Sequence, residues 1–177
     1  VEGYSVYSTF VDDQDQIWIG FRNDGLHIVP LFHSLFEPIV FEEDGAKEEF
    51  AILSLWEEEA QLWAGIKGGL RKIQKNTKAY QNYELPGKAS PLSITTWNDQ
   101  QLLIGTMTGE IFLFDKTNEN FIPFLKEDQA SFFADMKVNS LYPFSDNKLF
   151  IGSRPGTYIY NAQSEELKEV KASWTHT

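Results

Sequence analysis

The 177-residue sequence contains no cysteine, which excludes disulfide bonds and thiolate metal sites but leaves the cellular compartment open. It also lacks an apolar run long enough to cross a bilayer, so we expect no membrane-spanning helix. Positive charge is scarce, because 15 Lys and Arg face 26 acidic residues and the formal net charge is −11. Such a chain repels phosphate, and we therefore expect no nucleic-acid partner.

Motifs for catalysis and metal binding are missing as well. No G-x-S-x-G, H-E-x-x-H or P-loop occurs, and no carboxylate pair stands out as acid and base. The three histidines are scattered without metal-ligand spacing, at His27, His33 and His176. Asp12, Asp13 and Asp15 are close together, but Gln16 stands where an EF-hand loop needs glycine, which favours a capped turn over a calcium site. We predict a non-enzymatic segment with no cofactor and no metal.

Apolar and aromatic side chains are plentiful, at 42% and 15% of the residues. This composition predicts a packed core rather than disorder. The chain begins at Val1 rather than at a methionine, and its length suits one domain or a piece of a larger one. We interpret it as a processed protein or as a segment of a longer chain.

One unit recurs four times along the chain. The apolar runs "QIWIG", "QLWAG", "QLLIG" and "KLFIG" end at Gly20, Gly65, Gly105 and Gly152, which are 45, 40 and 47 residues apart. A second glycine follows each run, at Gly25, Gly69, Gly109 and Gly156, and an apolar segment comes next. Upstream, each unit places a hydroxyl two residues before an aromatic, as in Ser54-Leu55-Trp56. Each unit therefore predicts four strands joined by turns.

The turn residues agree with this interpretation. Polar links such as "DDQDQ" and "SDNK" suit tight hairpins. The second glycine of each unit is expected to adopt a positive φ, and the first is expected where a bulge forms or a neighbouring backbone approaches closely. Helical periodicity is weak, and "EDQASFFADM" predicts no more than a loop or a single turn.

A four-stranded antiparallel unit that repeats about every 44 residues is typical of a β-propeller blade. The strands are apolar on both faces, whereas a sandwich would alternate apolar and polar residues more cleanly. We predict an all-β chain, a propeller segment of four blades at about residues 4–45, 46–88, 89–130 and 131–177. Repeat gaps that average 44 residues and large aromatics at the blade interfaces favour a wider ring over a closed four-blade ring.

The units "SLWEEEAQLWAGIKGGLRKI", "QIWIGFRNDGLHIV" and "QLLIGTMTGEIFLFD" resemble the two-component regulator propeller repeat. The resemblance implies a sensor segment in the periplasm, part of a propeller of about seven blades. It also implies a hybrid two-component system whose other blades and histidine kinase lie elsewhere in the full-length protein. It further implies that the sensor detects glycan fragments, so the expected ligand is an oligosaccharide. Two alternatives remain open, a scaffold for protein–protein interaction and a glycan-active propeller enzyme.

Aromatic residues that recur at one position of the repeat are interpreted as packing between blades rather than sugar-binding platforms. This structural set consists of Phe10, Trp18, Trp56, Trp63, Trp97 and Tyr142.

Positions that vary between repeats are better ligand-binding candidates, because loops on a rigid scaffold commonly carry recognition. The candidates lie between the two glycines of each unit and are Arg22, Asn23, Asp24, Lys67, Thr108 and Arg154. The cations among them could meet carboxylates or sulfates of a glycan. An open four-blade segment would leave apolar faces on its first and last blades, so we also expect the isolated chain to self-associate, as two arcs related by a two-fold axis.

Overall fold

The computed structural model describes residues 5–30, 37–39, 41–43, 46–47, 51–145 and 147–171. The chain divides into two compact units, Val1–Ile94 and Thr95–Thr177, and each is considered by itself.

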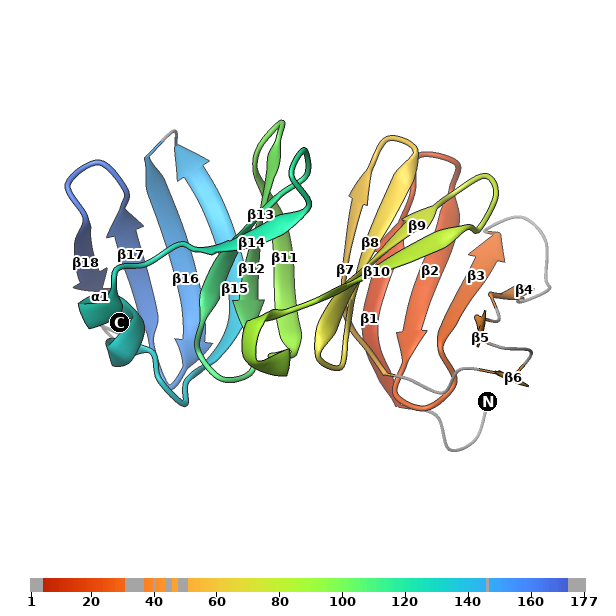
Figure 1. Ribbon diagram of the computed structural model, residues 1–177, viewed down its shortest axis with the longest axis horizontal. Helices are drawn as coiled ribbons and strands as arrows, with labels where there is room; N and C mark the ends of the chain where they lie inside the picture. The colour runs from red at the N-terminus through yellow and green to blue at the C-terminus, as the bar shows by residue number, and fades with distance from the viewer. Residues whose placement is uncertain are drawn as a thin grey trace, which may run out of the picture. The chain divides into compact units, whose positions relative to one another are not determined.

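Four antiparallel sheets of four strands make up the fold (Figure 1). Sheet 1 contains β1 (Val6–Val11), β2 (Gln16–Phe21), β3 (Leu26–Pro30) and β4 (Glu37–Ile39). Sheet 2 contains β7 (Ile52–Glu58), β8 (Gln61–Ile66), β9 (Gly69–Gln74) and β10 (Tyr80–Glu84). Sheet 3 contains β11 (Pro91–Asn98), β12 (Gln101–Thr106), β13 (Ile111–Asp115) and β14 (Asn120–Pro123). Sheet 4 contains β15 (Lys137–Ser145), β16 (Lys148–Arg154), β17 (Thr157–Asn161) and β18 (Glu166–Glu169).

This topology is the meander predicted from the repeats, with each strand hydrogen-bonded to the next one along the chain. The run that ends at the first glycine of each unit is the second strand in all four sheets. The chain is therefore an all-β segment built of propeller blades. Smaller elements are β5 (Glu42–Glu43) paired with β6 (Ala46–Lys47), a 3-10 turn at Pro86–Lys88 and the helix α1 (Glu127–Phe132). The helix, at six residues, is longer than the single turn expected.

Each sheet has two apolar faces, which we name from the first strand. The leading face carries the hydroxyl and the aromatic of the repeat, such as Ser54 and Trp56, and the trailing face is the opposite one. In the first unit, the leading face of sheet 1 packs against the trailing face of sheet 2. The buried cluster consists of Trp18, Leu26 and Ile28 from sheet 1, Ile52, Leu62, Ala64 and Ile73 from sheet 2, and Phe41.

The second unit repeats the same arrangement with different side chains. The leading face of sheet 3 supplies Leu103 and Ile111, and Trp97 and Leu113 pack beside them. The trailing face of sheet 4 supplies Val138, Leu141, Leu149, Ile151, Tyr158 and Tyr160. Phe133, which follows α1, is fully buried in this cluster. In both units, a leading face thus meets the trailing face of the following sheet.

A cross-strand pair of serine and glycine explains why these two residue types recur. Ser54 lies opposite Gly65 in the ladder of β7 and β8, after a register shift between Ile52 and Ser54 that marks a bulge. The Ser54 hydroxyl donates a hydrogen bond to the Pro91 carbonyl at 3.2 Å. A Cβ on Gly65 would lie 2.3 Å from the Ser54 oxygen and 2.9 Å from the Pro91 carbonyl. The glycine therefore leaves room both for the hydroxyl and for the neighbouring backbone.

The same pair occurs in other sheets with different surroundings. Ser8 faces Gly20, and a Cβ on Gly20 would lie 2.7 Å from the Ile52 side chain of sheet 2. Ser140 faces Gly152, and the only atom within 3.4 Å of an added Cβ is the Ser140 hydroxyl oxygen. The predicted close approach of a neighbouring backbone is thus confirmed at Gly65, whereas Gly20 makes room for a side chain of the following sheet.

The aspartate-rich turn between β1 and β2 is capped, as predicted. The Asp12 carboxylate accepts hydrogen bonds from the backbone N–H groups of Gln14 and Gln16 and from the Trp18 indole N–H, the last at 2.7 Å. Asp13 instead forms an ion pair with Lys75 of the following sheet, at 3.4 Å. The turn therefore stabilises its own hairpin and also links the two sheets of the first unit.

The second glycine of the repeat has the predicted positive φ in two of the four repeats. Gly25 and Gly109 have φ values of 69° and 102°. In the second repeat the prediction is wrong, because Gly68 rather than Gly69 adopts the positive φ, at 77°. Gly156 is not among the residues of positive φ either, and the bond before Pro155 is cis instead.

The structural aromatics fall into three groups by burial. Trp18 and Trp63 are 1% exposed, and Phe10, Trp56 and Trp97 are half-buried. Phe10 packs on the cluster of the first unit and Trp97 on that of the second. Tyr142 is 65% exposed, so the packing interpretation is wrong for this residue in the present chain. The physical reason is that the described residues include no sheet after sheet 4 to cover its leading face.

Replacement of Trp63 by alanine should lower the free energy of unfolding by about 3–5 kcal/mol, because a fully buried aromatic is truncated. The loss includes the hydrogen bond from the indole N–H to Glu58, at 3.1 Å. Ile122→Ala, at a side chain that is 40% exposed, is the control and should cost about 1 kcal/mol or less. Chemical denaturation measures both, and equal effects would contradict the burial of Trp63.

The contact of the serine–glycine pair with its surroundings leads to a second prediction, on the cost of adding a methyl group at the glycine. Gly65→Ala should destabilise the protein by about 1–3 kcal/mol, because the new methyl group meets the Pro91 carbonyl as well as Ser54. Gly152→Ala should cost clearly less, and Ser140→Ala should remove that cost, since the Ser140 hydroxyl is the one close obstacle. Ser54→Ala should not rescue Gly65→Ala. Rescue of both variants, judged by thermal melting, would show that the neighbouring backbone does not restrict Gly65.

Candidate functional site

The predicted ligand residues lie in the loops that follow the second strands of sheets 1 to 3, except Arg154, which is the last residue of β16. Arg22, Asn23, Lys67, Thr108 and Arg154 are exposed. Within the first unit, the loop between β2 and β3 thus presents one cation and the loop between β8 and β9 another. The loops offer charge, and the pocket described below contains none of the predicted residues.

Two of the predicted residues contact side chains two or three positions further along the chain. Asp24 is half-buried, and its carboxylate lies 2.8 Å from the His27 ring nitrogen. Thr108 donates a hydrogen bond of 2.7 Å to Glu110, which also accepts one of 2.6 Å from Thr106. Asp24 and Thr108 therefore fix the shape of their loops, whereas the side chains of Arg22 and Lys67 extend into solvent.

The loop between β12 and β13 lowers the pKa of the Glu110 carboxyl. Partial burial acts to raise the pKa of its carboxyl, but the hydrogen bonds from Thr106 and Thr108 outweigh it and lower the pKa below the ordinary value of 4.5. The Thr106 side chain is fully buried, so one of the two donors is fixed by the core. The loop of sheet 3 consequently presents a stable negative charge next to Thr108.

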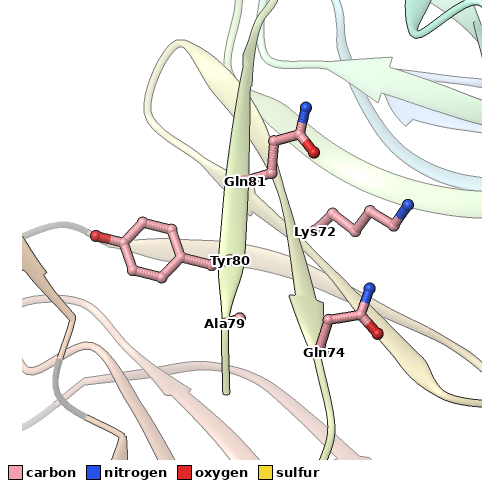
Figure 2. Close-up of a pocket in the computed structure, with 5 residues that line it drawn as sticks. All are labelled: Lys72, Gln74, Ala79, Tyr80 and Gln81. Atoms are coloured by element: carbon pink, nitrogen blue, oxygen red, sulfur yellow. The ribbon is translucent and has the colours of Figure 1, made fainter. Parts of the chain in front are cut away.

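A small pocket of about 170 Å³ lies on the outer strands of sheet 2 (Figure 2). Lys72 and Gln74 of β9 line it together with Ala79, Tyr80 and Gln81 at and within β10. In Figure 2, the side chains of Lys72 and Gln74 project to the same side of β9, and the Tyr80 ring points the opposite way. The pocket is smaller than the roughly 300–1,000 Å³ of pockets that enclose drug-sized ligands, so it can hold one ring-sized polar group at most.

The chemistry of the pocket is that of a polar rim beside an aromatic side chain. The Lys72 ammonium lies 5.6 Å from the centre of the Trp63 ring, within cation–π range. The amides of Gln74 and Gln81 each supply donors and an acceptor. Together these groups can hydrogen-bond hydroxyls or pair with a carboxylate.

The sequence analysis missed this pocket, although a signal was present. Trp63 pairs with Lys72 across the ladder, and the equivalent partners in the other sheets are Ile28, Leu113 and Ile159. A lysine thus replaces an aliphatic residue at one position of the repeat. Comparison of the strands as well as the loops among the four units would have identified Lys72.

A second lysine, which directly follows β9, has a structural role. Lys75 is 8% exposed and pairs with Glu57 and with Asp13. Burial opposes the charged form of Lys75, but the hydrogen bond and charge of Glu57, aided by Asp13, raise its pKa above 10.5. Lys75 is therefore engaged with both sheets of the first unit and is a poor candidate for ligand binding.

Within the described ranges, no group of three or more histidine, aspartate or glutamate side chains could hold a metal ion. The Asp12–Asp15 turn is closed by its own backbone, and His33 and His176 lie outside the ranges. No helix in the described part of the chain is long and apolar enough to cross a membrane.

Comparison with solved structures supports the fold. The chain is similar to the extracellular domain assigned to the hybrid two-component system BT3049 of B. thetaiotaomicron, with a TM-score of 0.73 and 19% identity over 93% of this chain. It is also similar to YCF48 bound to D1 peptide, with a TM-score of 0.70 and 13% identity over 94%. The computationally designed protein Ika8 gives a TM-score of 0.66 and 12% identity over 94%.

These similarities cover only part of the other proteins. The chain spans 23% of the BT3049 chain, 49% of the Ika8 chain and 55% of the YCF48 chain. No family model matches the sequence. No curated protein matches it either. The comparisons thus show a β-propeller segment, and identities this low carry no function across.

The pKa of Glu110 should lie below 4.5 in an NMR titration of its side-chain carboxyl, because hydroxyl donors stabilise the carboxylate. Its contribution to stability should be present above pH 4.5 and be lost as the pH falls through the lowered pKa. Thr108→Val removes one donor and should move the titration midpoint upward. A midpoint that Thr108→Val leaves unchanged would show that the hydroxyl does not bond the carboxylate in solution.

Proposed function

We propose that this chain is a ligand-recognition segment of an extracytoplasmic sensor propeller in a hybrid two-component system, and that its ligand is a glycan fragment. The kinase and the remaining blades belong to other parts of the full-length protein, and the site is periplasmic. The segment itself binds and does not catalyse.

The pocket of sheet 2 is the observation that carries the ligand class. Lys72, Gln74 and Gln81 present one ammonium and two amides around a volume that suits a single sugar ring. Amide side chains serve hydroxyl-rich ligands, because each one donates and accepts hydrogen bonds. The ammonium adds affinity for a uronic acid or a sulfated sugar. The small volume implies that the pocket binds one residue of a longer oligosaccharide.

Two further observations support the sensor role. The four repeats resemble the two-component regulator propeller, and the fold is similar to an extracellular domain of a hybrid two-component system. The exposed cations Arg22 and Lys67 lie in loops of the same unit as the pocket. They could contact further anionic groups of an extended glycan.

Calorimetric titration of the chain with acidic and neutral oligosaccharides tests the ligand class. Lys72→Met should weaken binding of an acidic oligosaccharide by about tenfold or more, as expected when a hydrogen bond to a charged group is lost. This variant also installs an aliphatic side chain like those at the equivalent positions of the other sheets, so the fold should be kept.

Lys88→Met is the matched control, because Lys88 is an exposed lysine of the same unit that lies outside the pocket. It removes the same charge and should leave the affinity unchanged. Equal losses in both variants would indicate a net-charge effect rather than a site at Lys72. No binding by the wild-type chain at millimolar oligosaccharide would contradict glycan recognition by this segment.

A specific observation supports one alternative function, that of a scaffold for protein–protein interaction. YCF48, a propeller of similar fold, is described in complex with a peptide. A chain that binds no oligosaccharide but captures a defined peptide would therefore be an interaction scaffold.

A further inference from the structure

One wall of the pocket in sheet 2 is formed by an edge strand. Among the described strands, β10 is the last of sheet 2 and pairs with β9 alone. Gln81 of β10 lies opposite Lys72 of β9 and lines the pocket, whereas the neighbouring Tyr80 ring points the opposite way (Figure 2). An edge strand lacks the second row of backbone hydrogen bonds that holds an inner strand. The contacts that β10 makes on its far side therefore matter for the position of Gln81.

Arg71 of β9 supplies contacts on that far side. Its side chain is fully buried on the face of the sheet that lies away from the pocket. The guanidinium carbon lies 4.2 Å from the centre of the Tyr80 ring and 4.6 Å from that of the Phe41 ring, and the two rings also meet edge to face. The Arg71 Nε–H donates a hydrogen bond of 2.7 Å to the Asn82 side-chain oxygen. Arg71 thus holds both neighbours of Gln81 along β10.

The repeat places a ring where sheet 2 has Arg71. The equivalent residues of the other sheets are His27, Phe112 and Tyr158. A planar guanidinium packs on aromatic rings much as another ring would, and it adds N–H donors that can bind a neighbouring strand. Two consecutive residues of β9 therefore depart from the repeat, Lys72 beside the pocket and Arg71 behind it.

We propose that Arg71 is a positioning residue of the pocket and fixes β10 through Tyr80 and Asn82. Gln81, which lies between these two residues, is thereby kept where it can reach a ligand bound at Lys72. Because its side chain is fully buried, Arg71 does not itself contact the ligand. This role rests on the proposed function, in which the pocket binds one sugar residue. Affinity should then follow the contact of the guanidinium with β10 rather than the overall stability of the fold.

Amide hydrogen exchange of β10 tests the hold on the strand without a ligand. Asn82 is exposed, so its replacement leaves the core intact. Asn82→Val should speed exchange in β10 about tenfold, because a hydrogen bond to a charged group is lost. Asn82→Asp keeps an acceptor oxygen and should exchange like the wild type.

Glu84→Val is the matched control for exchange. Glu84 lies on the same strand and the same face as Asn82, but it forms an exposed ion pair with Lys88 at 3.8 Å. Its replacement should leave exchange in β10 unchanged. Exchange that Asn82→Val leaves at the wild-type rate, or that both valine variants speed equally, would overturn the role of Arg71.

Calorimetric titration with a trisaccharide of galacturonic acid tests the role in binding. Asn82→Val and Arg71→Met should each weaken binding about fivefold or more, because a wall that is no longer held must be ordered when the ligand binds. Leu62→Ala is the control for stability, since Leu62 is fully buried in the same unit on β8, which pairs with β7 and β9. It should lower the melting temperature and keep the wild-type affinity below that temperature. Circular dichroism melting checks each variant, and Asn82→Val alone is decisive where Arg71→Met does not fold.

The outcomes separate this role from the proposed function. A trisaccharide that binds the wild type and Asn82→Val equally well would overturn the role of Arg71 and leave the proposed function standing. Equal losses of affinity in Leu62→Ala and Asn82→Val would overturn it too, because affinity would then follow stability. A wild-type chain that binds neither this trisaccharide nor any other oligosaccharide would contradict the proposed function, and the role of Arg71 in binding would be wrong with it.

Discussion

In the first unit, the approach of one element to the next depends on one steric constraint, the absence of a side chain at the first glycine of the repeat. At Gly65 an added Cβ would collide with the Ser54 hydroxyl and with the Pro91 backbone. The serine then fills the space and donates a hydrogen bond to the Pro91 carbonyl. A recurrent serine and a recurrent glycine are therefore two halves of one contact. Large apolar residues beside this contact, such as Trp63, complete the core.

The same constraint separates structural from functional positions. Recurrent residues that are fully buried, such as Trp18 and Trp63, serve the contact between faces, and their chemistry is not available to a ligand. Lys72 departs from the aliphatic pattern at its position, and its ammonium lines the polar pocket of sheet 2. The loop cations Arg22 and Lys67 are free of the core as well. Recognition in such a chain is expected where the repeat is broken.

Much of the fold could be predicted from the sequence, because a fourfold repeat multiplies a weak local signal. The order of the strands, the place of the glycine runs and the capped turn at Asp12 follow from spacing and turn chemistry. The exposure of Tyr142 did not follow, since burial depends on whether a neighbouring sheet exists, and the local pattern is identical in either case. The exchange of roles between Gly68 and Gly69 was also hidden, because either residue of a Gly-Gly pair can adopt a positive φ.

The candidate site was less accessible to sequence reasoning. The charge in the loops favoured Arg22 and Lys67. The pocket, however, is formed by side chains on adjacent strands. Its formation depends on the register that places Gln81 opposite Lys72, which only the folded ladder shows. Asp24 and Thr108 looked available, yet each is engaged by a neighbour within four residues of it.

A crystal structure of this chain is the measurement that tests the central claim most directly. The account predicts the Ser54 hydroxyl in direct hydrogen bond with the Pro91 carbonyl, with Gly65 packed against Pro91 and no water between them. A water layer at this position, or a Ser54 hydroxyl turned away from Pro91, would contradict the claim that the serine–glycine pair sets the approach of one element to the next.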